Sequence, residues 1–223
     1  MKKKAVVLLS GGLDSSVVLS ITKKTNFEIF CISFDYGQRH DLELFFAKKQ
    51  VKLQKIKNHR IFKVDFFGGS ALTDNIEVPE NENVENIPKT IPITYVPARN
   101  TIFLSYALGY CETIDSTDIF IGVNAVDYSG YPDCRQEFIL AFEKLANLAT
   151  KKGIDGQKFC IHTPLIDMTK KQIIKEGINN NVDFKNTLSC YNPKNNKPCG
   201  KCDACLLRDK GFSELRIKDP QFV

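Results

Sequence analysis

Short apolar runs alternate with longer amphipathic stretches along most of the chain. The apolar runs are continuous, which is typical of strands that helices cover on both faces of a parallel sheet. We therefore predict five strands, at residues 4–9, 28–34, 60–64, 118–123 and 158–163.

The stretches between these runs carry apolar residues at helical spacing. Such spacing is clear at residues 42–56 and 138–148 and less regular at residues 102–114. Alternation of strands and helices implies right-handed crossovers. The expected fold is an α/β, Rossmann-like, doubly wound parallel sheet of about five strands.

One stretch, residues 73–99, interrupts this alternation. It is polar, punctuated by prolines and without a period. A loop of this length in a compact domain is either functional or disordered, and the sequence leaves both alternatives open.

Composition fits this fold and narrows the function. The 223 residues, 43% of them hydrophobic, suffice for the core of one α/β domain. No apolar run approaches the ~20 residues of a membrane span, and the first run is too short for a signal peptide. We expect a cytoplasmic protein that binds no membrane. The net charge of +5 is modest and spread out, so we expect no direct contact with nucleic acid.

The loop after the first predicted strand has the composition of a phosphate-binding loop. It reads SGGLDSS at residues 10–16, and it leads into a predicted helix. Gly11 and Gly12 let the backbone approach an anion, while Ser10, Ser15 and Ser16 add hydroxyl donors. Asp14 is suited to cap the helix and to hold Mg²⁺ on the phosphates. The alternative is an ordinary turn between a strand and a helix.

The C-terminal part contains four closely spaced cysteines, Cys190, Cys199, Cys202 and Cys205. Four thiolates form a closed tetrahedral site, which suits one structural Zn²⁺, and an Fe–S cluster is the main competitor. We expect a nucleotide-binding α/β domain at residues 1–186, with a zinc-binding segment at residues 187–223 packed on it.

The motif S-G-G-x-D-S-S resembles the signature of the PP-loop ATP pyrophosphatases, which cleave ATP between the α- and β-phosphates. Members of that family commonly add a later lysine for the phosphates. Lys170, at an expected helix start in PLIDMTKKQII, is the candidate, and a solvated helix lysine is the alternative. The resemblance implies that the nucleotide contacts Leu8, Leu9, Ser10, Gly11, Gly12, Leu13, Asp14, Ser15, Ser16, Val17, Val18 and Lys170.

Four further stretches resemble the family of 7-cyano-7-deazaguanine synthases: FDYGQRH, YVPARNTIFLS, GVNAVDYSGYPDCRQEFI and TLSCYNPKNNKPCGKCDAC. That resemblance implies an ATP-dependent ligase that acts on 7-carboxy-7-deazaguanine and ammonium in queuosine biosynthesis, and it favours a homodimer. Aromatic, carboxylate and arginine side chains near the carboxyl ends of the strands suit a flat purine-like acid. The candidate substrate residues are Tyr36, Gln38, Arg39, His40, Arg99, Asn100, Asp127, Tyr131, Asp133 and Arg135.

Each of these substrate roles has a structural alternative: Tyr131 might only pack a loop, for example, and Arg99 might only form an ion pair. No side chain has the setting of an essential nucleophile, so positioning and charge stabilisation would carry the reaction. Two other functions stay open. One is a different PP-loop enzyme, such as a tRNA-thiolating enzyme or an amide-forming ligase, and the other is a zinc-ribbon module that binds nucleic acid.

Overall fold

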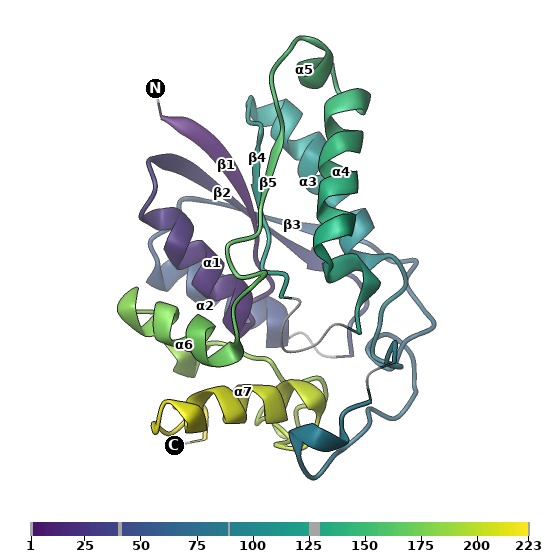
Figure 1. Cartoon of the computed structure of the whole chain (residues 1–223), viewed down its shortest axis with the longest axis vertical. Helices are drawn as coiled ribbons and strands as arrows, with labels where there is room; N and C mark the ends of the chain where they lie inside the picture. The colour runs from purple at the N-terminus through teal and green to yellow at the C-terminus, as the bar shows by residue number, and fades with distance from the viewer. Residues whose placement is uncertain (1, 40–41, 89, 125–129, 223) are drawn as a thin grey trace.

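A five-stranded, all-parallel sheet forms the centre of the computed structural model (Figure 1), which describes residues 2–39, 42–88, 90–124 and 130–222. The strand order is β3-β2-β1-β4-β5. The strands are β1 (Lys3–Leu8), β2 (Phe27–Asp35), β3 (Asn58–Lys63), β4 (Asp118–Phe120) and β5 (Cys160–His162).

Helices cover both faces of this sheet (Figure 1), so the α/β prediction is confirmed. The α-helices are α1 (Leu13–Lys23), α2 (Leu42–Leu53), α3 (Arg99–Ile114), α4 (Gln136–Ala149), α5 (Lys151–Ile154), α6 (Lys170–Asn179) and α7 (Asp203–Glu214). Three short 3₁₀ turns are η1 (Val84–Asn86), η2 (Pro132–Cys134) and η3 (Phe184–Asn186).

Strand β1 shows why its sequence is continuously apolar. Val6 packs into the core under α3 and α4, whereas Val7 packs into the core under α1 and α6. Both residues are fully buried, because successive side chains of a strand point to opposite faces of the sheet.

Strands β4 and β5 are shorter than the apolar runs that predicted them. The Ile121 N–H still donates to the His162 carbonyl oxygen, at 3.1 Å, but the ladder ends there. Gly122 then passes so close to helix α1 that a β-carbon on it would lie 3.1 Å from the Ser15 nitrogen. The last part of this apolar run therefore lines the loop side of the sheet instead of extending it.

The long polar loop lies against the cysteine-rich segment (Figure 1). The backbone N–H of Asn81 donates to the Lys201 carbonyl oxygen at 2.9 Å, and its side-chain amide donates to Asp203 at 2.8 Å. Glu80 lies 3.4 Å from Lys194 and 3.5 Å from Lys201. These contacts hold this part of the loop against the cysteine-rich segment.

A buried arginine of helix α7 bonds residues of the preceding and following segments. Arg208 donates two hydrogen bonds to Asp219, one to the Thr187 hydroxyl and one to the Phe184 carbonyl oxygen, at 2.6–2.9 Å. Within the described part of the chain, no helix combines the length and the apolar character needed to cross a membrane.

Candidate active site

A cavity of about 290 Å³ opens at the carboxyl edge of the sheet. Its walls include the ends of β1 and β2, the segment after β4, the start of α1 and the start of α3. Strands β1 and β4 are neighbours although their crossovers lead to opposite sides, and ligands of doubly wound folds bind at such a point.

The glycine loop enters this cavity because helix α2 lies directly against it. Gly11 has a φ of +83°, and a β-carbon there would lie 2.4 Å from the backbone carbonyl oxygen of Glu43 and from the backbone nitrogen of Ala47. Glycine is therefore required both by the backbone conformation and by the packing.

The three serines of the loop are not equivalent. Ser10 and Ser15 line the cavity, and their hydroxyl oxygens lie 3.0 Å apart. Ser16 is fully buried, and its hydroxyl donates to the Gly12 carbonyl oxygen at 2.7 Å. Val17 and Val18 belong to the core beneath. The cavity wall thus takes Leu8, Leu9, Ser10, Gly12, Leu13, Asp14 and Ser15 from the predicted nucleotide stretch.

Asp14 lies in the first turn of α1 and does not cap it, so that expectation was wrong. The N-cap is Gly12, and no side chain accepts a hydrogen bond there. The Asp14 carboxylate instead faces Lys170, whose ammonium group lies 2.8 Å from both of its oxygens. Lys170 is the first residue of α6, as expected, and Thr169 and Gln172 form a capping box at that start.

The opposite wall of the cavity contains Tyr36, Arg99, Asn100 and Tyr131 from the predicted substrate residues. Tyr131 shares hydrogen bonds with the hydroxyls of Thr94, at 2.9 Å, and Tyr191, at 3.2 Å. Burial disfavours the charged form of Arg99, but the electrostatic attraction of Tyr36, Tyr131 and Glu43 raises its pKa, so the guanidinium stays charged.

Other predicted residues support the walls without lining the main cavity. Gln38 accepts a hydrogen bond from the Tyr36 N–H at 2.8 Å, and Arg39 donates to the carbonyl oxygens of Ala71 and Ile76. A buried carboxylate oxygen of Asp133 accepts the Asn100 N–H at 3.0 Å, which fixes the start of α3. Three remaining predictions concern Arg135, which is exposed just before α4, and His40 and Asp127, which lie outside the described residues.

Several cavity residues were not predicted, and Glu43 matters most among them. It lies in the first turn of α2, where only the apolar spacing of the segment drew attention in the sequence. Burial raises its pKa, and Arg99 and hydrogen bonding with Tyr36 offset only part of that rise. The other unpredicted lining residues include Phe103, Asn124, Cys134, Ser189, Tyr191 and Arg208.

Cys134 is the cysteine that faces the cavity. Burial raises the pKa of its thiol to about 12, and the nearby Asp133 carboxylate adds to the rise. The Asn100 side-chain amide donates to the sulfur at 3.3 Å. The thiol is therefore protonated at neutral pH, and this setting is unlike that of a nucleophilic cysteine.

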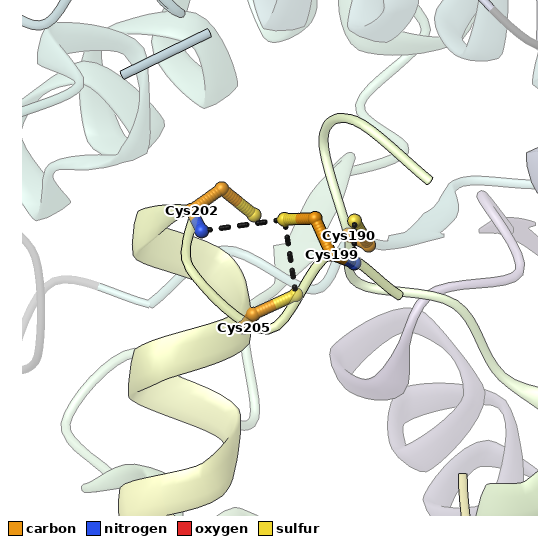
Figure 2. A group of neighbouring side chains, drawn as sticks. All are labelled: Cys190, Cys199, Cys202 and Cys205. Carbon is orange, nitrogen blue, oxygen red and sulfur yellow. Dashed lines mark hydrogen bonds between the residues drawn. The ribbon is translucent and has the colours of Figure 1, made fainter. Parts of the chain in front are cut away.

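The four C-terminal cysteines converge on one point (Figure 2). Their chain neighbours Ser189, Tyr191 and Ala204 line the cavity. Their sulfur atoms all lie within 4.8 Å of one another, and those of Cys199 and Cys205 are 4.0 Å apart. Tetrahedral thiolates on Zn²⁺ at 2.3 Å would place sulfurs about 3.8 Å apart. This cysteine cluster therefore fits a single thiophilic metal ion.

Backbone amides connect the cysteine cluster with the cavity. The Tyr191 N–H donates to the Cys202 sulfur at 3.4 Å, while the Tyr191 hydroxyl contacts Tyr131 in the cavity wall. The Leu188 N–H donates to the Gly11 carbonyl oxygen at 3.0 Å. The segment that brings Cys190 to the cluster thus runs along the glycine loop itself.

Comparison with known families gives one match over nearly the whole chain. The family model described as queuosine biosynthesis protein QueC matches residues 4–216. A 7-cyano-7-deazaguanine synthase from Rhodopirellula baltica is 57% identical, covering 97% of this chain and 90% of the relative. One of the same name from Rickettsia akari is 54% identical, covering 98% of both chains.

Comparison with solved structures supports the fold. NMN synthetase from Francisella tularensis aligns with a TM-score of 0.52 at 15% identity, covering 97% of this chain and 79% of that one. A 4-thiouridine synthetase, solved with RNA and bound ATP, aligns with a TM-score of 0.52 at 16% identity. The alignment covers 95% of this chain and 53% of that one. At these identities the likeness concerns the arrangement of the sheet and helices alone.

Proposed function

The chain belongs to the family of the queuosine biosynthesis protein QueC, and on this premise we propose that it is a 7-cyano-7-deazaguanine synthase. It would convert 7-carboxy-7-deazaguanine and ammonium to the nitrile at the expense of ATP, as a ligase that forms a carbon–nitrogen bond. The observation that carries the proposal is identity above 50% over nearly the full length of synthases with this name.

The proposed reaction uses ATP twice. The substrate carboxylate attacks the α-phosphorus, pyrophosphate leaves, and ammonia then displaces AMP from the acyl adenylate to give an amide. The amide oxygen attacks a second ATP, and loss of AMP leaves the nitrile. No step needs a protein nucleophile, which agrees with the protonated state of Cys134.

We assign the phosphates to the side of the cavity that contains the glycine loop. Gly12, Ser10 and Ser15 offer N–H and O–H donors, and the start of α1 favours negative charge. Lys170 and Asp14 lie opposite each other at this point, one suited to the phosphates and the other to a cation. Mg²⁺, when bound with ATP, would neutralise phosphate charge there.

We assign the deazaguanine acid to the side formed by Arg99 and the aromatic residues. A charged guanidinium in a partly enclosed site suits a bidentate contact with the acid. Tyr36, Phe103 and Tyr131 offer flat faces to a purine-like ring. Among the other predicted substrate residues, Asn100 lies on this side, while Gln38, Arg39, Asp133 and Arg135 would act from behind the wall.

We propose Zn²⁺ as the ion of the cysteine cluster, with a structural role. All four ligand positions are filled by cysteine, so no position is left for a substrate. We also propose residues 1–186 as the nucleotide-binding domain, with residues 187–223 packed on it and not independent of it. The hydrogen bonds of Leu188 to Gly11 and of Arg208 to Phe184 support this arrangement.

For its assembly and location, we propose a cytoplasmic homodimer that does not contact nucleic acid directly. Support for a dimer comes from large apolar side chains exposed on α4 and at the end of α5, which a partner would cover. Leu140, Leu148 and Ile154 are 56%, 70% and 77% exposed. The modest net charge agrees with the absence of a nucleic-acid partner.

One incubation tests the proposed function: the protein, ATP, Mg²⁺, ammonium and 7-carboxy-7-deazaguanine, followed by nucleotide analysis and mass spectrometry. We expect AMP and pyrophosphate with the amide and then the nitrile. ADP as the sole nucleotide product would contradict cleavage between the α- and β-phosphates. Turnover that appears only when tRNA is added would favour the tRNA-thiolating alternative.

A further inference from the structure

The cavity contains more titratable side chains than phosphate and acid binding require. The catalytic role left open is that of a side chain that accepts protons from the reacting nitrogen. Among the described residues, the titratable lining groups are Asp14, Tyr36, Glu43, Arg99, Tyr131, Cys134, Lys170, Tyr191 and Arg208. No histidine of the described part of the chain lines this cavity: His59 lies on β3 beside Ser33, and His162 lies on β5 beside Asp118.

Three of these groups are already held in ion pairs. Lys170 and Asp14 bond each other through both carboxylate oxygens. Arg208 is held by Asp219, with the two side chains 2% and 1% exposed. The lysine and arginine cations have no lone pair that could accept a proton, and both oxygens of the Asp14 carboxylate are occupied by Lys170.

The tyrosines and the cysteine are excluded by their protonation. Burial raises the pKa of Tyr36, Tyr131 and Tyr191 above the ordinary tyrosine value. Burial likewise raises the pKa of Cys134 to about 12. All four keep their protons at neutral pH, so they can donate hydrogen bonds but cannot act as bases. Arg99 stays a cation.

Glu43 differs from these groups because it is a carboxylate that lines the cavity from the first turn of α2 and has a pKa that burial raises. Protein surrounds its carboxylate, and the side chain keeps solvent contact only in part. Tyr36, from β2, and Arg99, from α3, face it, and Arg39 and Tyr191 line the small hollow beside it. Burial favours its protonated form and Arg99 favours its ionised form, which leaves the group able to take up a proton and to release it.

The proposed reaction needs such a group, because nitrogen must lose protons in both halves. We infer that Glu43 is the general base of the amination and dehydration steps, an inference that rests on the proposed function. In the first half, the nitrogen lone pair attacks the acyl adenylate, the Glu43 carboxylate takes one N–H proton, and the C–O bond to AMP breaks. The products are the amide, AMP and protonated Glu43, which returns its proton to solvent.

In the second half, the amide oxygen bonds to the α-phosphorus of the second ATP and pyrophosphate leaves. The nitrogen then loses both of its protons, and the C–O bond breaks with departure of AMP. The nitrogen lone pair and one N–H electron pair form the two π bonds of the nitrile, and the other N–H pair stays on nitrogen as its lone pair. Glu43 takes these protons one at a time, and the carboxyl oxygen of the substrate leaves on AMP.

The two adenylation steps transfer no proton to the enzyme, and this difference supplies the test. Labelled pyrophosphate exchanges into ATP when the acid is adenylated reversibly without ammonium. We expect Glu43→Gln to keep acid-dependent exchange within about threefold of wild type and to lose amide and nitrile formation by about 100-fold or more. Glu43→Asp should restore part of the lost rate, because the carboxylate is kept.

The matched control is Glu28→Gln. Glu28 is an exposed glutamate near the start of β2, whereas the end of β2 lines the cavity. This variant should match wild type in both assays. In addition, nitrile formation by wild type should rise with pH through a limb that Glu43→Gln lacks.

Two results would overturn the inference alone. One is nitrile formation by Glu43→Gln within threefold of wild type. The other is a parallel loss of exchange and nitrile formation, or a raised KM for the acid in the exchange assay, which would make Glu43 a substrate contact or a structural residue. Wild-type protein that shows neither exchange nor nitrile would overturn the proposed function, and the inference with it.

Discussion

Lys170 donates two hydrogen bonds of 2.8 Å to the carboxylate of Asp14, although 156 positions separate the two residues in the chain. One residue begins α6 and the other lies in the first turn of α1, so their pairing joins two helix starts at the cavity. Both side chains are still partly accessible, at 15% and 29%. An incoming phosphate would therefore meet an ammonium group that is already positioned.

Replacing Lys170 tests this arrangement. We expect Lys170→Met to lower AMP formation by about 100-fold, because a positioned cation that stabilises phosphate charge is worth a few kcal/mol in such sites. The control is Lys171→Met, since Lys171 follows on the same helix and is exposed. Equal activities of the two variants would show that Lys170 is only a structural partner of Asp14.

Cys134 separates the proposed reaction from thiol chemistry. Because burial raises the pKa of its thiol to about 12, we expect little thiolate below pH 9. Cys134→Ser, which keeps an acceptor for the Asn100 amide, should form nitrile within a few-fold of wild type. A loss of about 1,000-fold, or rapid alkylation of Cys134 at pH 7, would instead indicate a reactive cysteine.

The cysteine cluster should be measurable as one metal ion per chain. Cys202→Ser removes a ligand. We therefore expect the metal content per chain, measured by elemental mass spectrometry, to fall and the melting temperature to drop. The position of Tyr191 in the cavity wall should also become less fixed, since its N–H donates to the Cys202 sulfur. The control is Cys160→Ser, a change at a half-buried cysteine on β5. Iron with visible absorption would identify an Fe–S cluster instead.

The sequence predicted the parts of this molecule that depend on local patterns. Continuous apolar runs located the five strands. The composition of the glycine loop and the close spacing of the four cysteines identified these two sites. Lys170 was found because the resemblance to the PP-loop family implied a later lysine, and this one stood at an expected helix start. The wrong expectation, a capping role for Asp14, failed because the helix begins at Leu13, so Asp14 lies inside the first turn, where its carboxylate meets Lys170. That partner is distant in the chain and invisible to local pattern.

The substrate side could be predicted only in part, for the same reason. Gln38 and Arg39 belong to a motif, but in the fold they bond the backbone of nearby loops. Glu43 lies in a stretch for which the sequence predicted only a helix, and the packing of α2 on Gly11 brings it to the cavity. Which side of a helix meets a cavity depends on tertiary packing, which apolar spacing does not encode.

The last prediction concerns Arg208 and the proposed unity of the C-terminal segment with the α/β domain. Arg208 is buried with Asp219 and also bonds Thr187 and the Phe184 carbonyl oxygen. Arg208→Met would leave the Asp219 carboxylate buried without its cation, which costs roughly 3–5 kcal/mol. For a chain of this size, we expect a melting temperature lower by roughly 10 °C. The control is Lys210→Met, a change on the exposed face of α7.

If both segments form one unit, circular dichroism and metal release will report the same single transition in both variants. Metal release well below the main unfolding transition in wild type would show instead that residues 187–223 unfold separately.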